Sequence, residues 1–416
     1  MKSIIKVFMA IVVAISLTCW GICEAKEWKN GVVRIGTMAG MTGGFADVGQ
    51  AQVMGVADRV KYQNEELNGI GGHEIENLWA DMKTDVPTAI RLYKRWAAMK
   101  PKPIQITIGH SSATHQLIKE FNKDEIVNVS LNWNAPQIVP PGYVFWPMPG
   151  YADMVVAFGK WLEETWDYEA KGKPKVAFLR WDHPCGVAIA KYAGSYCQKE
   201  GYFDVVTDQI VPIGAIDVTT QVMQLIKEKP DFVYTMLLGS TSVAIKQAHE
   251  MGLKAQFVLR AYDTGKAYVD ASGELAEGLL GVLPCARLTD VDQPGVAKIL
   301  KVHGKYHPNG EIADDFSYIC GWLIADLVIE AANNVVEEKG YANLTGNNVK
   351  EALEKIQNYD TGGLTHPISF GKGTLGRIGN PYARMVKYEL DKKKWSPLSK
   401  WYNVPFITNE GCFKEN

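Results

Sequence analysis

Two short segments contain side chains that could carry out nucleophilic chemistry. Ser111 follows His110, and Cys185 comes shortly after Asp182 and His183. A serine or cysteine nucleophile needs a histidine base and an acid beside it in the folded protein. No Gly-x-Ser-x-Gly motif, which would place a serine on a strand-to-helix turn, occurs in the chain. Because the residue types for such chemistry are present but this motif is not, a hydrolase is only the alternative to a binding site that uses the same polar residues.

Histidine, cysteine and glycine patterns predict neither a metal nor a nucleotide site. His110 and His115 are five residues apart, whereas the HExxH motif of metalloproteases spaces its histidines by four, so Asp124 is not expected to join them in a metal site. The glycine-rich segment 69–72 lies between a predicted helix and a predicted strand, which is the reverse of a phosphate-binding turn. We therefore expect no metal and no cofactor.

The length and charge of the chain exclude some classes of protein. The chain has 416 residues, which exceeds the size at which a single core stops growing, so two domains are expected. Lys and Arg number 44 and Asp and Glu number 46, giving a formal net charge of −2. Since positive charge is not in excess, nucleic acid is not an expected partner.

The first 25 residues have the pattern of a secretory signal peptide. Lys2 and Lys6 flank the start of an apolar stretch over 7–17, and Ala25 offers a cleavage site before Lys26. A membrane anchor and a lipoprotein signal are the alternatives. The richest later apolar segment, 318–336, contains two acidic residues, so we expect an exported, soluble mature protein. Five cysteines remain in it, an odd number, so at least one is unpaired within the chain.

Strand and helix patterns alternate along the mature chain. This alternation predicts βαβ units with parallel sheets, in two runs that join near 147–150. The tail, from about 285, contains three predicted helices and then a β-hairpin whose turn is Asp391–Lys394. The predicted strands cover residues 32–36, 74–80, 104–108, 126–130, 175–179, 203–211, 231–234, 257–259 and 278–283.

Several segments occur in the order found in one protein family. The segment 32–93 begins VVRIGTMAGMTGGFADVGQ and contains the stretches NEELNGIGG and DMKTDVPTAIRLY. The stretches IGHSSATHQ, KPDFVYTMLLGSTSVAIKQAHEMGL and ASGELAEGLLGVLP follow. This series resembles the periplasmic solute-binding proteins of branched-chain amino acid ABC transporters, from about Val32 to Trp401. The resemblance implies a type I periplasmic binding protein fold, with two doubly wound Rossmann-like α/β lobes, three crossovers and a ligand in the interlobe cleft.

The resemblance also implies the division of the chain into lobes. Residues 1–25 would be the signal peptide, and residues 26–147 with 285–358 would form the first lobe. Residues 148–284 with 359–408 would form the second lobe, followed by a C-terminal tail over 409–416. Ligands of open α/β sheets bind at the carboxyl ends of the strands, where helix N-termini favour an anion.

The family's pocket can be carried over residue by residue. The serine that holds the ligand carboxylate matches Ser111, which we also expect to cap its helix, and the closing tyrosine is replaced by Cys185. The acidic partner of the ligand ammonium aligns with Asp263, which is shorter than the usual glutamate. The further ligand-binding positions are Ser112, Asn132, Trp133, Asn134, Thr235, Leu238 and Tyr262.

The resemblance implies a binding protein rather than an enzyme. It would capture a small carboxylate- or amide-bearing solute, an amino acid or a related and even aromatic compound, by cleft closure. It would then deliver that solute to an ABC transporter permease in the membrane. A ligand-sensing subunit of a membrane receptor is the alternative partner role. Aromatic residues near the cleft, namely Trp133, Trp146, Tyr151, Trp181 and Tyr262, favour an apolar or aromatic ligand. A monomer is expected.

Overall fold

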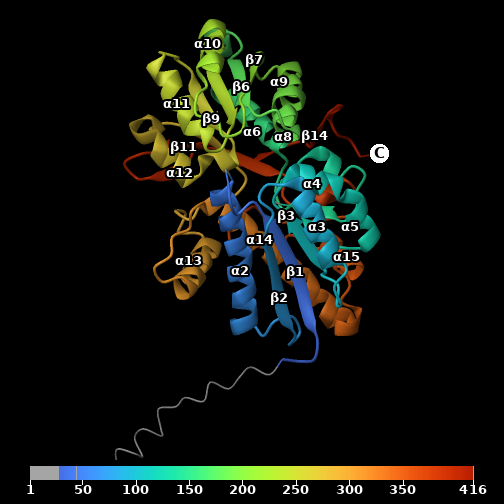
Figure 1. Cartoon of the computed structure of the whole chain (residues 1–416). Helices are drawn as coiled ribbons and strands as arrows, with labels where there is room; N and C mark the ends of the chain where they lie inside the picture. The colour runs from blue at the N-terminus through green and yellow to red at the C-terminus, as the bar shows by residue number, and fades with distance from the viewer. Residues whose placement is uncertain (1–27, 44, 131, 416) are drawn as a thin grey trace, which may run out of the picture.

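The chain folds into two α/β lobes, which Figure 1 shows one above the other. The structure is a computed structural model that describes residues 28–43, 45–130 and 132–415. The predicted signal peptide lies outside these residues. Each lobe contains a largely parallel sheet covered by helices, so the two-lobed fold predicted from the alternating pattern is confirmed.

The sheet of the first lobe is parallel throughout. Its strand order is β2-β1-β3, and a bridge between Gln105 and Val127 extends it to β4 and β5. Every residue of β3 is buried, as expected for a central strand with helices on both faces. The strands are β1 (Val32–Ala39), β2 (Glu74–Asp81), β3 (Gln105–Ile108), β4 (Asn128–Val129) and β5 (Val144–Phe145).

The helices of the first lobe come from both halves of the chain. They are α2 (Ala46–Glu66), α3 (Val86–Ala97), α4 (Ser111–Gln116), α5 (Ile118–Asp124), α13 (Pro294–Tyr306), α14 (Asp315–Lys339) and α15 (Gly346–Lys355). The single helix predicted over 111–121 is interrupted at Leu117, which separates α4 from α5.

The long apolar helix α14 packs along α2 at glycines. A Cβ on Gly55 would lie 2.2 Å from the carbonyl oxygen of Tyr318, and one on Gly321 would lie 2.1 Å from that of Gln52. Within the described chain, α14 is the helix long and apolar enough to cross a membrane, but most of it is buried in the lobe. Its length and composition are therefore those of a core helix.

The sheet of the second lobe runs in the order β7-β6-β8-β9-β10-β11-β12, with β13 paired to β11. It is parallel as far as β10, and β11 and β12 are antiparallel. Glu389 pairs with Lys394 in the predicted hairpin, which is confirmed. The strands are β6 (Lys175–Arg180), β7 (Asp204–Ile210), β8 (Phe232–Met236), β9 (Gln256–Leu259), β10 (Leu280–Leu283), β11 (Tyr382–Glu389), β12 (Lys394–Pro397) and β13 (Tyr402–Asn403). A further hairpin joins β14 (Ile407–Thr408) to β15 (Gly411–Cys412).

Helices cover the second sheet, and the predicted helix over 186–200 is subdivided. It consists of α8 (Pro184–Val187), a π-helical segment (Ala188–Ala193) and α9 (Gly194–Glu200). The other helices are α6 (Tyr151–Thr165), α7 (Tyr168–Lys171), α10 (Thr219–Glu228), α11 (Ser240–Glu250) and α12 (Lys266–Ser272). The chain passes between the sheets in the segments 146–150, 284–293 and 356–381.

Candidate functional site

A cavity of about 230 Å³ lies between the lobes, at the carboxyl ends of their strands. Its walls are the ends of strands and the segments that follow them, from β1, β2, β3 and β4 in the first lobe and from β6, β7, β8 and β9 in the second, together with the start of α6. This is the edge at which doubly wound sheets bind ligands. The lining residues are Gly40, Phe45, Val48, Gly49, Gln52, Thr84, Gly109, His110, Ser111, Asn132, Tyr151, Trp181, His183, Cys185, Ile213, Met236, Leu238, Arg260 and Tyr262.

Ser111 lies on the cavity wall where the two lobes touch. Its hydroxyl oxygen is 3.3 Å from Sγ of Cys185 and 3.4 Å from Nε2 of His183, both in the second lobe. The neighbouring Ser112 hydroxyl is 3.1 Å from the same Nε2. Figure 1 shows α4 and α8, which carry these groups, beside each other at the junction of the lobes. The predicted capping role of Ser111 is taken by His110, whose Nδ1 accepts the backbone N–H of Ala113.

The proton on His183 is placed by its backbone contact. Nδ1 of His183 accepts the N–H of Cys185 at 3.4 Å, so in the neutral ring Nε2 carries the hydrogen and donates it to the serine hydroxyls. Burial, followed by the charges of His110 and Arg260, lowers the pKa of His183 to about 4. Burial also lowers the pKa of His110. Both rings are therefore neutral at pH 7.

These contacts do not assemble a nucleophilic site. A catalytic histidine donates Nδ1–H to an acid and accepts at Nε2, and His183 has the opposite arrangement. Asp182 is exposed and lies 3.9 Å from Arg180. Burial raises the pKa of Cys185 to about 11, so its sulfur remains a thiol at neutral pH. The cysteines of the described chain, Cys185, Cys197, Cys285, Cys320 and Cys412, are all free.

A buried arginine, which the sequence reasoning missed, forms part of the second-lobe wall. Arg260 directly follows β9 and is 4% exposed. Its guanidinium carbon lies 5.4 Å from the ring centres of Tyr151 and Tyr262 and 5.8 Å from that of Trp181. Burial acts to lower the pKa of Arg260, but Asp263, Tyr151, Cys185 and Tyr262 together raise it above its ordinary value, so the side chain is charged.

Asp263 does not line the cavity, where a partner of a ligand ammonium would be expected to lie. It is fully buried behind the wall, and its carboxylate accepts hydrogen bonds from Thr235 Oγ1, the backbone N–H groups of Leu237 and Leu238, and Arg260 Nε, at 2.9–3.2 Å. These donors occupy both of its oxygens. The carboxylate thus holds the turn after β8, where Leu238 has a φ of 46° and reaches the cavity.

Three buried polar atoms of the wall have no hydrogen-bond partner within the described chain. They are Nε1 of Trp181, Oγ1 of Thr84 and Oε1 of Gln52. Buried polar groups are usually paired, so these three atoms are available to hydrogen-bond with a molecule in the cavity. None of the described lining residues is an aspartate or a glutamate.

The remaining predicted positions divide between the wall and the interior. Asn132 lines the cavity, but its amide donates to Ile108 O at 2.8 Å and accepts from Gln137 at 2.8 Å. Ser112, Trp133, Asn134 and Thr235 are not among the lining residues. Of the aromatic residues singled out from the sequence, Tyr151, Trp181 and Tyr262 line the cavity, and Trp133 and Trp146 lie in the core.

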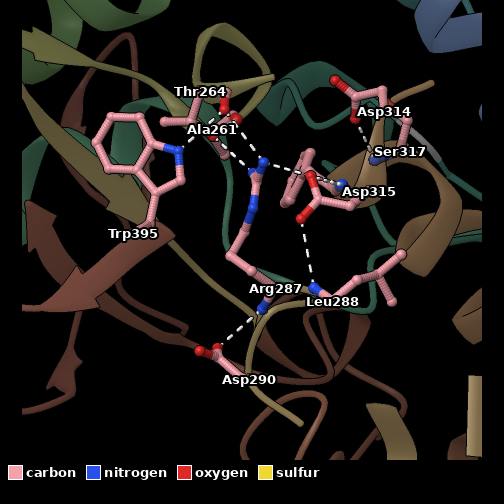
Figure 2. Close-up of polar contacts among 10 residues, drawn as sticks. Ala261, Thr264, Arg287, Leu288, Asp290, Asp314, Asp315, Ser317 and Trp395 are labelled. Atoms are coloured by element: carbon pink, nitrogen blue, oxygen red, sulfur yellow. Dashed lines mark hydrogen bonds and ion pairs between the residues drawn. The ribbon is translucent and has the colours of Figure 1, made fainter. Parts of the chain in front are cut away.

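A second buried arginine supports the segment that carries Arg260. Figure 2 shows Arg287, in a crossover between the lobes, reaching the turn after β9 and the start of α14. Its Nη1 donates to Thr264 Oγ1 at 2.8 Å and its Nη2 to Thr264 O at 3.1 Å, while Nη2 also pairs with Asp315. Trp395 Nε1 donates to the same Thr264 carbonyl at 3.1 Å. The cavity wall of the second lobe is thereby tied to a helix of the first lobe at the crossover.

This two-lobed fold with a cleft at the strand ends is that of the type I periplasmic binding proteins. Residues 32–393 match the family model described as periplasmic binding protein, and the chain belongs to that family. The Leu/Ile/Val-binding protein of Escherichia coli is 26% identical over 258 residues, which cover 61% of this chain and 67% of that protein.

Solved structures share the fold at low sequence identity. A branched-chain amino acid ABC transporter protein from Thermus thermophilus with bound valine has a TM-score of 0.81 at 20% identity, covering 90% of this chain and 97% of that one. A solute-binding protein of an ABC transporter from R. palustris in complex with benzoate has a TM-score of 0.73 at 17% identity, covering 89% and 96%. The expectation of a binding protein rather than an enzyme is confirmed by the family model and by the curated relative, which is a binding protein. Family membership also implies an extracytoplasmic location.

Proposed function

We propose that this protein captures a small organic carboxylate that lacks an α-ammonium group and delivers it to an ABC transporter permease. The observation that carries the proposal is the polarity of the cavity wall. Its charged group is Arg260, and no acidic side chain is present among the described lining residues. The fold itself does not select the ligand, since similar folds hold valine in one protein and benzoate in another.

The neutral groups of the wall are also oriented as donors. The Ser111 oxygen accepts from the Cys185 thiol and from His183 Nε2–H, which leaves its own O–H to be donated. The unpaired Trp181 Nε1 can only donate. Arg260 has five N–H donors, of which Nε–H is directed at Asp263. Together these donors suit a carboxylate, which only accepts.

An α-ammonium would find no carboxylate as counter-charge among the described lining residues. Taking an ion out of water costs several kcal/mol unless a partner charge compensates it. A difference of 3 kcal/mol corresponds to roughly 150-fold in affinity. We therefore expect an amino acid to bind at least about 100-fold more weakly than the same acid without its amino group.

The body of the ligand would lie among apolar side chains. Phe45 and Trp181 face each other across the cleft with ring centres 5.3 Å apart, and Met236 and Leu238 complete the second-lobe wall. The cavity is below the 300–1,000 Å³ typical of drug-sized ligands, so a small aromatic or branched aliphatic acid is favoured.

Binding to matched compounds tests the proposal. Mature protein beginning at Lys26 would be titrated calorimetrically with 3-phenylpropanoate against phenylalanine, 4-methylpentanoate against leucine, and benzoate against benzamide. The acids without an amino group should bind more tightly within each of the first two pairs, and benzoate should bind more tightly than benzamide. Equal or tighter binding of leucine or phenylalanine would contradict the proposed ligand class. Uptake of the tightest ligand, lost on deleting the gene and restored by it, would test the delivery step.

A further inference from the structure

A cluster of one aspartate and two histidines lies on the first lobe, outside the interlobe cavity. Asp58 is on α2, His303 is on α13 and His307 caps the end of α13. Asp58 and His303 are buried, whereas the side chain of His307 is 35% exposed. One carboxylate oxygen and one ring nitrogen from each histidine all lie within 4.8 Å of one another.

The distances within the cluster are close to those between ligands of one metal ion. Asp58 Oδ2 is 3.2 Å from His303 Nδ1, and Asp58 Oδ1 is 2.7 Å from His307 Nε2. Ligand atoms bound at about 2.0–2.2 Å in a tetrahedral zinc site are separated by roughly 3.4 Å. The histidines are four residues apart, with ring centres 4.7 Å apart, so both point from one face of the helix end.

The contact of His303 with a backbone carbonyl indicates that Nδ1, the ring nitrogen facing Asp58, carries a lone pair. Nε2 of His303 is 3.3 Å from the carbonyl oxygen of Gly310, an acceptor, so Nε2 carries a hydrogen. In the neutral ring Nδ1 is then an acceptor that faces the carboxylate of Asp58. Two acceptors face each other stably only with a cation or an additional proton between them. A histidine that ligates a metal usually donates its other N–H to a carbonyl in this way.

The carboxylate also has an outer partner. The hydroxyl of Tyr318, on α14, donates to Asp58 Oδ2 at 2.6 Å. Such a contact orients a ligating carboxylate. The ligand atoms thus come from α2 and α13, and Tyr318 on α14 orients the carboxylate of Asp58. The exposed side of His307 gives an ion a path from solvent.

We propose that Asp58, His303 and His307 bind one divalent transition-metal ion of the Zn²⁺ class. Imidazole and carboxylate donors suit such ions, whereas Ca²⁺ and Mg²⁺ prefer oxygen ligands alone. The bound ion would fasten α13, which directly follows a crossover between the lobes, to the helices α2 and α14. The site is separate from the proposed solute site, so its test does not depend on the ligand class proposed above.

The test uses untagged mature protein freed of metal with a chelator. Zn²⁺ would be titrated in competition with a chromophoric chelator, and Mg²⁺ would be titrated in parallel. We expect one equivalent of Zn²⁺ per chain, a rise in the unfolding temperature, and no response to Mg²⁺. Asp58→Asn and His303→Ala should each abolish the tight equivalent.

His307→Ala keeps the test decisive if the buried variants do not fold, because His307 is partly exposed. It should weaken Zn²⁺ binding at least about tenfold, and Tyr318→Phe about 10- to 100-fold. The exposed His249→Ala is the matched control and should bind Zn²⁺ as the wild type does. Wild-type protein that binds no Zn²⁺ equivalent, or His307→Ala protein that binds it unchanged, would overturn the proposal and leave the cluster as a proton-mediated contact.

Discussion

Replacement of Arg260 by glutamine is the sharpest perturbation of the proposed solute site. Glutamine keeps much of the bulk beside Tyr151 and Tyr262 but removes the charge. A hydrogen bond to a charged group contributes about 1.5–3 kcal/mol. Loss of one such contact therefore corresponds to roughly 10- to 150-fold weaker binding of the carboxylate. Removing one partner of the buried pair with Asp263 should lower stability, as in any buried ion pair. The fold should persist, because Asp263 retains Thr235 and two backbone N–H donors.

The assay is calorimetric titration of the tightest acid and of its neutral amide. In Arg260→Gln the affinity for the acid should fall, while the affinity for the amide should change little, so selectivity between them narrows. Arg59→Gln is the matched control, because Arg59 is also buried and pairs through Nε with a buried carboxylate, Asp326, at 2.6 Å. That variant should lose stability but keep the affinity of the wild type.

One result would refute the reasoning. If folded Arg260→Gln protein binds the acid as tightly as the wild type, the guanidinium does not contact the ligand. Its role would then be restricted to neutralising Asp263 and packing against the aromatic rings. Arg260→Lys separates charge from geometry, because lysine keeps the positive charge but lacks the planar fork of donors.

Three further predictions concern single side chains. Ser111→Ala should weaken carboxylate binding by about 1–3 kcal/mol, and unchanged calorimetric affinity would remove Ser111 from the site. Burial raises the pKa of Asp153 to about 7. The folded protein therefore retains a proton that the unfolded chain releases near pH 4. Because the folded state binds more protons between these values, the free energy of unfolding falls as pH rises from about 4 to about 7. Relative to Asp153→Asn, the wild-type free energy of unfolding, measured by urea titration, should fall by up to about 1.4 kcal/mol per pH unit in that window; parallel curves would exclude this account. Gly55→Ala should cost about 1–3 kcal/mol because its Cβ meets the carbonyl of Tyr318, whereas Gly304→Ala, with open space around it, should not destabilise α13.

The fold could be predicted from the sequence because its signals are local and repeated. Buried strands such as 104–108 are short apolar runs, and helices follow them at regular intervals. Breaks within helices were not predictable in the same way. The interruption at Leu117 and the π-helical turn near Ala190 depend on tertiary packing, and residues with high helix propensity do not reveal them.

The site was harder to predict because burial decides which polar residue is available. Asp263 and Arg260 are three residues apart, and the resemblance to the family implies a role for the acid only. The structure shows that the backbone N–H groups of Leu237 and Leu238, which are 26 and 25 residues away in sequence, donate hydrogen bonds to that carboxylate. A sequence signal for Arg260 did exist, since a charged residue directly after a buried strand lies at the ligand-binding edge.

The contact between α2 and α14 has a consequence for how the protein matures. Asp58 and Tyr318 are hydrogen-bonded partners separated by 260 residues of chain. A protein that crosses a membrane from its N-terminus presents α2 long before α14 emerges, and all strands of the second lobe up to β10 appear in between. The glycine-bearing face of α2 therefore stays uncovered until α14 has emerged. Closing such a distant contact is slow and leaves apolar surface exposed in the interval, so completion of the first lobe is the step at which chaperones would matter most.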